Sequence, residues 1–198
     1  MVRKLIAAAA LIVVTSAALM AAEFWDDKPF ITWSDEELQR MLTDSPWSRT
    51  LPVSFNAVDL EHQLTITWRS ALPMKQALIR AQVGLNGAVP PASQDVLART
   101  EEAYAVSLTG LPLVITPFFD LAKKQTFLLR EGKPPVAVEE LLSTPQPGDT
   151  YLLLAVFPKS AAITVDDGDV EFVTVLGGIQ IRRKFTLKEM VFHGQLEL

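Results

Sequence analysis

Apolar and polar residues alternate through the last third of the chain, and this alternation predicts antiparallel strands. The dipeptides Asp167-Gly168 and Gly177-Gly178 interrupt the alternation, and both are typical of two-residue hairpin turns. The strands that these turns would join are residues 163–166, 169–176, 179–185 and 190–198. The pattern therefore predicts a four-strand antiparallel meander. The residues expected on the apolar face of its last strand are Met190, Phe192, Leu196 and Leu198.

Further strands are expected in the middle of the chain. Residues 64–68 and 104–108 alternate between apolar and polar side chains, as in a half-buried strand. Residues 126–130 and 136–139 flank a turn-like segment that contains Gly and Pro. Residues 151–157 are apolar on both faces, which is typical of a strand with a neighbour on each side.

Helices are expected only in the N-terminal half. Ser34 and Glu37 have the spacing of a capping box, which predicts the start of a helix. Pro73 suits the first turn of a second helix, and Gly84 is placed to end it. A weaker pattern predicts a third helix within residues 93–103.

The order of these elements predicts the fold class. Helices come early and strands come late, which argues against a parallel sheet of alternating strands and helices. We expect an α+β fold with a predominantly antiparallel sheet of seven or more strands. The sheet would bend into a sandwich or half-barrel, with two or three short helices packed on it. The most linker-like stretch is residues 143–149, but it is too short to mark a domain border.

Residues 1–22 have the composition of a removable signal peptide. Arg3 and Lys4 give a positive start, residues 5–22 carry no charge, and small residues precede the first acidic residue. Retention of this segment as a membrane anchor is the alternative, although its length is at the short limit for a span. We expect one exported domain over residues 23–198, in the periplasm or outside the cell.

Composition narrows the range of functions. The chain contains no cysteine, so an exported domain must be stabilised by its core without disulfides. The formal net charge is −5 and basic residues are not clustered, which excludes the usual surface of a nucleic-acid-binding protein. His62 and His193 are far apart in the sequence; His62 lies in a polar lead-in to a strand, and His193 is expected on the polar face of the last strand. We therefore expect no transition-metal site and no cofactor.

Acidic residues leave two chemical alternatives open. Asp166, Asp167 and Asp169 surround a glycine, and this cluster would suit either calcium or a simple hairpin turn. Neither a Gly-x-Ser-x-Gly elbow nor a Gly-rich phosphate loop occurs in the sequence. An acid-based hydrolase or lyase remains an alternative, because catalytic carboxyl pairs have no fixed spacing in a sequence.

Two features are candidate binding sites. Residues 23–33 form an irregular aromatic arm, and Trp25, Trp33 and Trp47 lie in or near it. Exposed rings would bind a sugar, a peptide or a partner protein, whereas buried rings would hold the arm against the sheet. Arg69 lies between a predicted strand and a predicted helix. It would bind an anion or a partner's carboxylate, or it would pair with an acidic residue of the first helix.

Four sequence blocks together resemble a group of uncharacterised exported bacterial proteins. The blocks are Trp33-Ser34, Asp44-Ser45-Pro46-Trp47, the run from Trp68 to Pro73, and the run from Phe185 to Leu196 with the pattern FxLKxMxFxGxL. They are spread over nearly the whole of residues 23–198, so the resemblance concerns a whole domain. It implies export and brings no activity, substrate, cofactor or functional residue.

These observations favour an exported, non-enzymatic binding module or envelope-associated module. Its partner would be an envelope protein, a peptide or a saccharide. A membrane would be a partner only if the first segment is retained as an anchor. The acid-based hydrolase or lyase is the alternative function.

Overall fold

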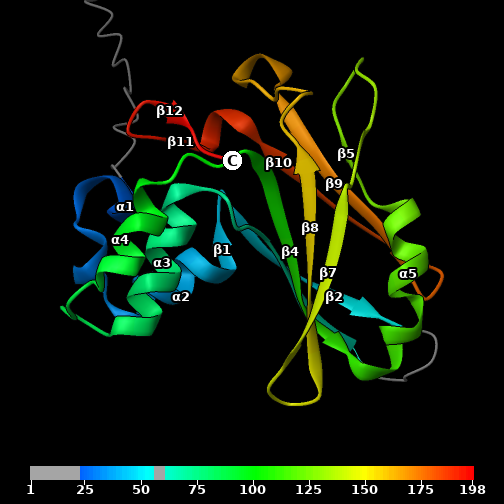
Figure 1. The fold of residues 1–198 in the computed structure, drawn as a ribbon, viewed down its shortest axis with the longest axis horizontal. Helices are drawn as coiled ribbons and strands as arrows, with labels where there is room; N and C mark the ends of the chain where they lie inside the picture. The colour runs from blue at the N-terminus through cyan, green and yellow to red at the C-terminus, as the bar shows by residue number, and fades with distance from the viewer. Residues whose placement is uncertain (1–22, 56–60) are drawn as a thin grey trace, which may run out of the picture.

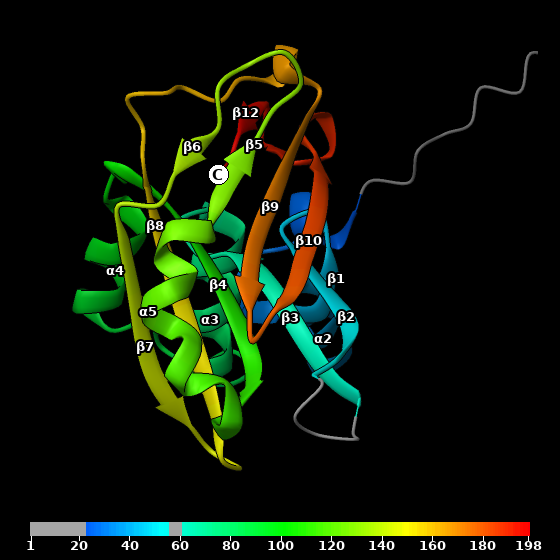
Figure 2. The same ribbon diagram turned by 90° about the vertical axis from the view of Figure 1, so that its right-hand side faces the viewer.

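The computed structural model of the protein describes residues 23–55 and 61–198, so the predicted signal peptide lies outside the described residues. Two antiparallel sheets pack face to face, and most of the helices lie at one side of them (Figure 1). Figure 2 shows the smaller sheet in front of the larger one. Contacts between rings join the two sheets, with centroids 5.9 Å apart for Trp68 and Phe185 and 6.3 Å apart for Phe157 and Phe172.

The larger sheet has six strands, all antiparallel to their neighbours. In spatial order they are β1 (Asp44–Ser45), β2 (Ser48–Ser54), β3 (Glu61–Trp68), β4 (Ala103–Pro112), β8 (Thr150–Pro158) and β7 (Glu140–Gln146). Leu64, Ile66 and Trp68 are fully buried, as the alternation of β3 predicts. β8 has a neighbour on each side, which its two apolar faces predict.

The smaller sheet has four strands, and a separate pair of short strands lies near the C-terminal end. The four are β10 (Ile179–Thr186), β9 (Asp169–Leu176), β5 (Phe127–Leu129) and β6 (Val136–Ala137), and the pair is β11 (Val191–Phe192) with β12 (Gln195–Leu196). Gly177 and Gly178 join β9 to β10 with φ of 57° and 79°. Both values lie in the left-handed region that a tight hairpin turn requires, so this prediction is confirmed.

Five short α-helices and several 3-10 turns complete the described residues. The α-helices are α1 (Phe24–Asp27), α2 (Asp35–Thr43), α3 (Leu72–Val83), α4 (Pro91–Ala98) and α5 (Phe119–Ala122). The 3-10 turns are η1 (Phe30–Thr32), η2 (Leu113–Phe118), η3 (Lys123–Gln125), η4 (Val165–Asp167) and η5 (Leu187–Glu189). Helices α1 to α4 form one group, and α5 lies on the opposite side of the sheets (Figure 1). The expected α+β class with antiparallel sheets is confirmed.

The predicted helix ends are largely confirmed. Ser34 and Glu37 form the full capping box at the start of α2. Pro73 lies in the first turn of α3, and Gly84 follows its last residue with φ of 79°. The third helix ends at Ala98, earlier than predicted, because the residues that follow lead into β4.

Four other expectations about local structure are wrong. The arm of residues 23–33 is not irregular, since it contains α1 and η1. Asp167-Gly168 is not a hairpin turn, because residues 165–167 form η4, held by a capping box with Thr164. Residues 143–149 are not a linker, because most of them belong to the edge strand β7. The last segment is not one strand but the short hairpin of β11 and β12, which turns at His193 and Gly194. Three of the four residues predicted on the apolar face, Met190, Phe192 and Leu198, are still buried, and Leu196 is half-buried.

Buried apolar side chains from both sheets and from the helices form one continuous cluster. The aromatic arm is part of it, because Trp25 and Trp33 are 5% and 0% exposed. The ring of Trp25 lies 5.9 Å from that of Trp47, edge to face. The N-terminal segment is therefore packed onto the sheet by its aromatic residues.

Candidate functional site

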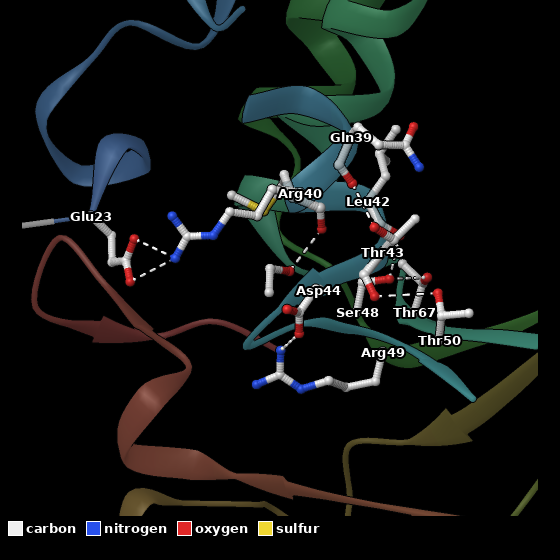
Figure 3. A network of polar contacts seen from close by, with 12 residues as sticks. Glu23, Gln39, Arg40, Leu42, Thr43, Asp44, Ser48, Arg49, Thr50 and Thr67 are labelled. Carbon is white, nitrogen blue, oxygen red and sulfur yellow. Dashed lines mark hydrogen bonds and ion pairs between the residues drawn. The ribbon is translucent and has the colours of Figure 1, made fainter. Parts of the chain in front are cut away.

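The backbone around Arg69 is fixed by contacts on both sides of β3. The N–H of Trp68 donates to the carbonyl of Trp47 at 2.9 Å, and the N–H of Arg69 donates to the carbonyl of Ala105 at 2.7 Å. The hydroxyls of Ser48 and Thr67 lie 2.8 Å apart and are both buried (Figure 3). β3 ends at Trp68, and the backbone of the next residue, Arg69, is held in place by these contacts.

Arg69 lines a hollow of about 320 Å³ between α3 and α4, which we call the Arg69 groove. Its lining residues are Arg69, Lys75, Leu78, Ile79, Gln82, Ser93, Val96 and Glu101. The four residues from α3 follow the spacing i, i+3, i+4, i+7, so they share one face of the helix. Those from α4 are one turn apart and face them across the groove.

The charges in the groove do not balance. The ammonium of Lys75 lies 2.6 Å from a carboxylate oxygen of Glu101, and the Lys75 side chain is only 9% exposed. The side chain of half-buried Arg69 makes no hydrogen bond or ion pair with any described residue. Burial lowers the pKa of Arg69 below its ordinary value, as desolvation of a cation should. The groove thus contains one guanidinium whose charge no neighbour compensates.

Arg80 shows what a compensated buried arginine looks like in this fold. It is 2% exposed, its Nε donates to the carbonyl of Trp33 at 2.9 Å, and its Nη2 lies 2.9 Å from Oδ1 of Asp35. Asp35 is the first residue of α2. One alternative for Arg69 was a pair with an acidic residue of the helix that follows Ser34, which is α2. Arg80 makes that pair instead.

A second hollow, of about 460 Å³, lies beside α1 and β1, and its arginines are paired. Arg40 holds the carboxylate of Glu23 through two hydrogen bonds of 3.0 and 2.8 Å, and Arg49 donates to Asp44 at 2.6 Å (Figure 3). Trp25 reaches the wall of this hollow. Both arginines that line this hollow are already paired with carboxylates, so neither has an uncompensated positive charge that would bind an anion.

A third hollow, of about 480 Å³, lies beside Asp167. The Asp167 side chain is 1% exposed, lies 3.6 Å from Nη1 of Arg130, and also pairs with Lys133. Burial on its own would raise the pKa of this carboxyl. The hydrogen bonds from Lys133 and from the N–H of Thr164, with the two positive charges, outweigh that effect and lower the pKa. Asp167 is therefore held ionised, which suits a structural anchor between loops.

Glu37 is the other carboxyl group among the described residues whose pKa is shifted, and its pKa is also lowered. Its pKa is lowered chiefly by a hydrogen bond from Lys28 and then by the N–H of Ser34. A general acid at neutral pH needs a raised pKa. Neither carboxyl group fits that role.

Of the four predicted site residues, the structure places the three tryptophans in the core and Arg69 in a groove. Trp25, Trp33 and Trp47 are 5%, 0% and 0% exposed, which agrees with the packing alternative for the aromatic arm. The indole Nε1 of Trp47 donates to the carbonyl of Glu197 at 2.8 Å. These rings and Arg69 do not form one surface.

The two histidines lie in different parts of the fold. His193 is exposed at the turn of the last hairpin, and His62 is half-buried in β3 beside Phe55. Within residues 23–55 and 61–198, no three His, Asp or Glu side chains are grouped in a way that could hold a metal ion.

Most of the groove was not predicted from the sequence. Lys75 and Glu101 pair across 26 positions and carry no local signal. Two basic residues of α3, Lys75 and Arg80, are also buried, although basic side chains usually stay exposed. Lys75 pairs there with Glu101, whereas Arg80 donates to the carbonyl of Trp33 and to Asp35.

Comparison of the chain with protein-family models, with curated proteins and with solved structures finds no match. Among the described residues, no helix is long and apolar enough to cross a membrane.

Proposed function

We propose that the protein is an exported, non-enzymatic binding module that takes a negatively charged ligand in the Arg69 groove. The observation that carries the proposal is the uncompensated guanidinium of Arg69. A buried or half-buried charge without a partner is costly, and a ligand's anion would relieve that cost. The volume of about 320 Å³ is at the small end of the range for ligand pockets.

The ligand would be a small molecule or the anionic part of a peptide, saccharide or envelope protein. Export rests on the signal-like pattern of residues 1–22 and is part of the same proposal. Fractionation of cells that express the full chain tests export directly. We expect the protein outside the cytoplasm with its N-terminus near Glu23, and a cytoplasmic protein with an intact N-terminus would contradict it.

Thermal-shift screening of the purified protein tests the binding role. The panel contains anionic and neutral fragments of cell-wall sugars, peptides and lipids, each measured with the wild type and with Arg69→Gln. We expect anionic compounds to raise the melting temperature of the wild type and not of Arg69→Gln. Equal shifts for both proteins, or turnover of a compound by the wild type, would contradict the proposal.

An acid-based hydrolase or lyase is less well supported. It needs two carboxyl groups in a cleft whose pKa values are pushed apart. Asp167 lines the third hollow, but its pKa is lowered and two basic residues pair with it. Its neighbours Asp169 and Glu171 lie in ion pairs with Lys184 and Arg182.

A further inference from the structure

The Arg69 groove changes character along its length, and both of its helices give the same order. Along α3, Lys75 comes first, Leu78 and Ile79 follow, and Gln82 comes last. Lys75 and Gln82 are about 10 Å apart along the helix axis at 1.5 Å per residue. Arg69 precedes the start of α3 and so belongs to the Lys75 end, which carries the unpaired positive charge. The middle of the groove is apolar, and its other end is polar.

Helix α4 matches this order when it is followed in the opposite direction. Glu101, which follows α4 in the chain, pairs with Lys75 at the first end of the groove. Going back along α4 from there, Val96 comes next and Ser93 comes last. Val96 is 39% exposed, so part of the apolar wall faces open space in the groove. An apolar ligand chain would cover this wall and gain hydrophobic free energy there.

The net charge at the cationic end limits the ligand's anion. Lys75 is already paired with Glu101, so among the described lining residues of the groove only Arg69 has an unpaired positive charge. One guanidinium compensates one negative charge and forms two parallel hydrogen bonds with a carboxylate. A second negative charge on the ligand would face the Glu101 carboxylate, which disfavours a dianion such as phosphate.

We propose that the Arg69 groove binds an aliphatic monocarboxylate, with its carboxylate on Arg69 and its chain along Leu78, Ile79 and Val96. This inference rests on the proposed binding function and adds the ligand class. The same chemistry occurs in a free medium-chain fatty acid and in the terminal carboxylate of an apolar peptide. The groove favours the free acid, because its apolar middle offers no partner for a peptide group.

Calorimetric titration of the purified protein with octanoate tests the ligand class. Acetate provides the anion without the chain, octanol the chain without the anion, and a tripeptide ending in leucine the peptide source. We expect octanoate to bind at least about tenfold more tightly than acetate, octanol or the tripeptide.

Three variants locate the binding. Arg69→Gln should weaken octanoate binding about tenfold or more, because a charge-assisted hydrogen bond is lost. Val96→Ser changes an exposed wall residue and should weaken binding about threefold. Arg182→Gln removes an exposed arginine on β10 and should bind like the wild type.

The outcomes separate this inference from the proposed function. Binding of the tripeptide or of phosphate through Arg69, without octanoate, would overturn the ligand class and leave an anion-binding module. Octanoate binding that Arg69→Gln and Val96→Ser leave unchanged would also overturn it. Absence of any Arg69-dependent binding of an anion would overturn both.

Discussion

The side-chain carboxylate of Glu197 accepts a hydrogen bond of 3.0 Å from the backbone N–H of Leu72, the first residue of α3. Ala71 precedes the helix and provides no side-chain cap, so Glu197 caps it from a distant part of the chain. The backbone carbonyl of Glu197 also accepts the hydrogen bond from the indole N–H of Trp47. The C-terminal segment thus fixes the start of α3 and, through α3, one wall of the Arg69 groove.

Removal of this cap should destabilise the protein. We expect Glu197→Ala to lower the free energy of unfolding by about 1 kcal/mol, because an N–H group and the positive end of the helix dipole lose their partner. Glu197→Gln keeps an acceptor and should lower it by about half as much. Urea unfolding of both variants measures these free energies. If Glu197→Ala had the same free energy of unfolding as the wild type, the cap would contribute nothing to stability.

Arg80 and Asp35 form one ion pair, but we expect them to contribute unequally to the free energy of unfolding. Arg80→Met leaves the carbonyl of Trp33 without its donor in a buried place, and we expect a loss of about 2–3 kcal/mol. The Asp35 side chain is 95% exposed, so Asp35→Asn should lose less than about 1 kcal/mol. The same unfolding measurement applies, and equal losses would contradict this ranking.

Asp167 should make stability sensitive to acid. Its pKa is lower in the folded protein than the usual unfolded value of about 3.9. Its stabilising contribution is therefore complete above about pH 5 and is lost as the pH falls through the folded-state pKa. We expect Asp167→Asn to lower the free energy of unfolding at pH 7 by about 2 kcal/mol, because the carboxylate pairs with the nearly buried Arg130 and, more weakly, with Lys133, which is 46% exposed.

Unfolding curves between pH 7 and pH 3 provide the check. The difference in the free energy of unfolding between the wild type and Asp167→Asn should decrease as the pH falls below about 5. A gap that stays constant over this range would mean that Asp167 stabilises the fold by some means other than its charge.

Local patterns were sufficient where the structure depends on neighbours in the sequence. The turn at Gly177-Gly178 was predictable, because its two residues adopt positive φ and the strands around it alternate. The capping box of Ser34 and Glu37 was predictable for the same reason, since both partners lie within one helical turn.

Long-range pairing accounts for what the sequence did not reveal. Asp167-Gly168 resembles a hairpin turn, but Asp167 is held by Arg130 and Lys133 from the β5–β6 hairpin. Residues 143–149 have the composition of a linker, yet most of them form an edge strand because β8 pairs with them. In the groove, Arg69 was identifiable as a candidate, but its lack of a partner depends on Glu101 being taken by Lys75.

Among the residues that the structure describes, the charge of Arg69 has no partner, and the variant Arg69→Met tests this finding. Without ligand, an apolar side chain of similar length should raise the free energy of unfolding by about 0.5–1.5 kcal/mol, because it removes an uncompensated, half-buried charge. Arg80→Met, the matched control, should lower it. If Arg69→Met instead destabilised the protein by more than about 1 kcal/mol, Arg69 would be a structural residue with partners of its own, which would contradict its role as an anion-binding group.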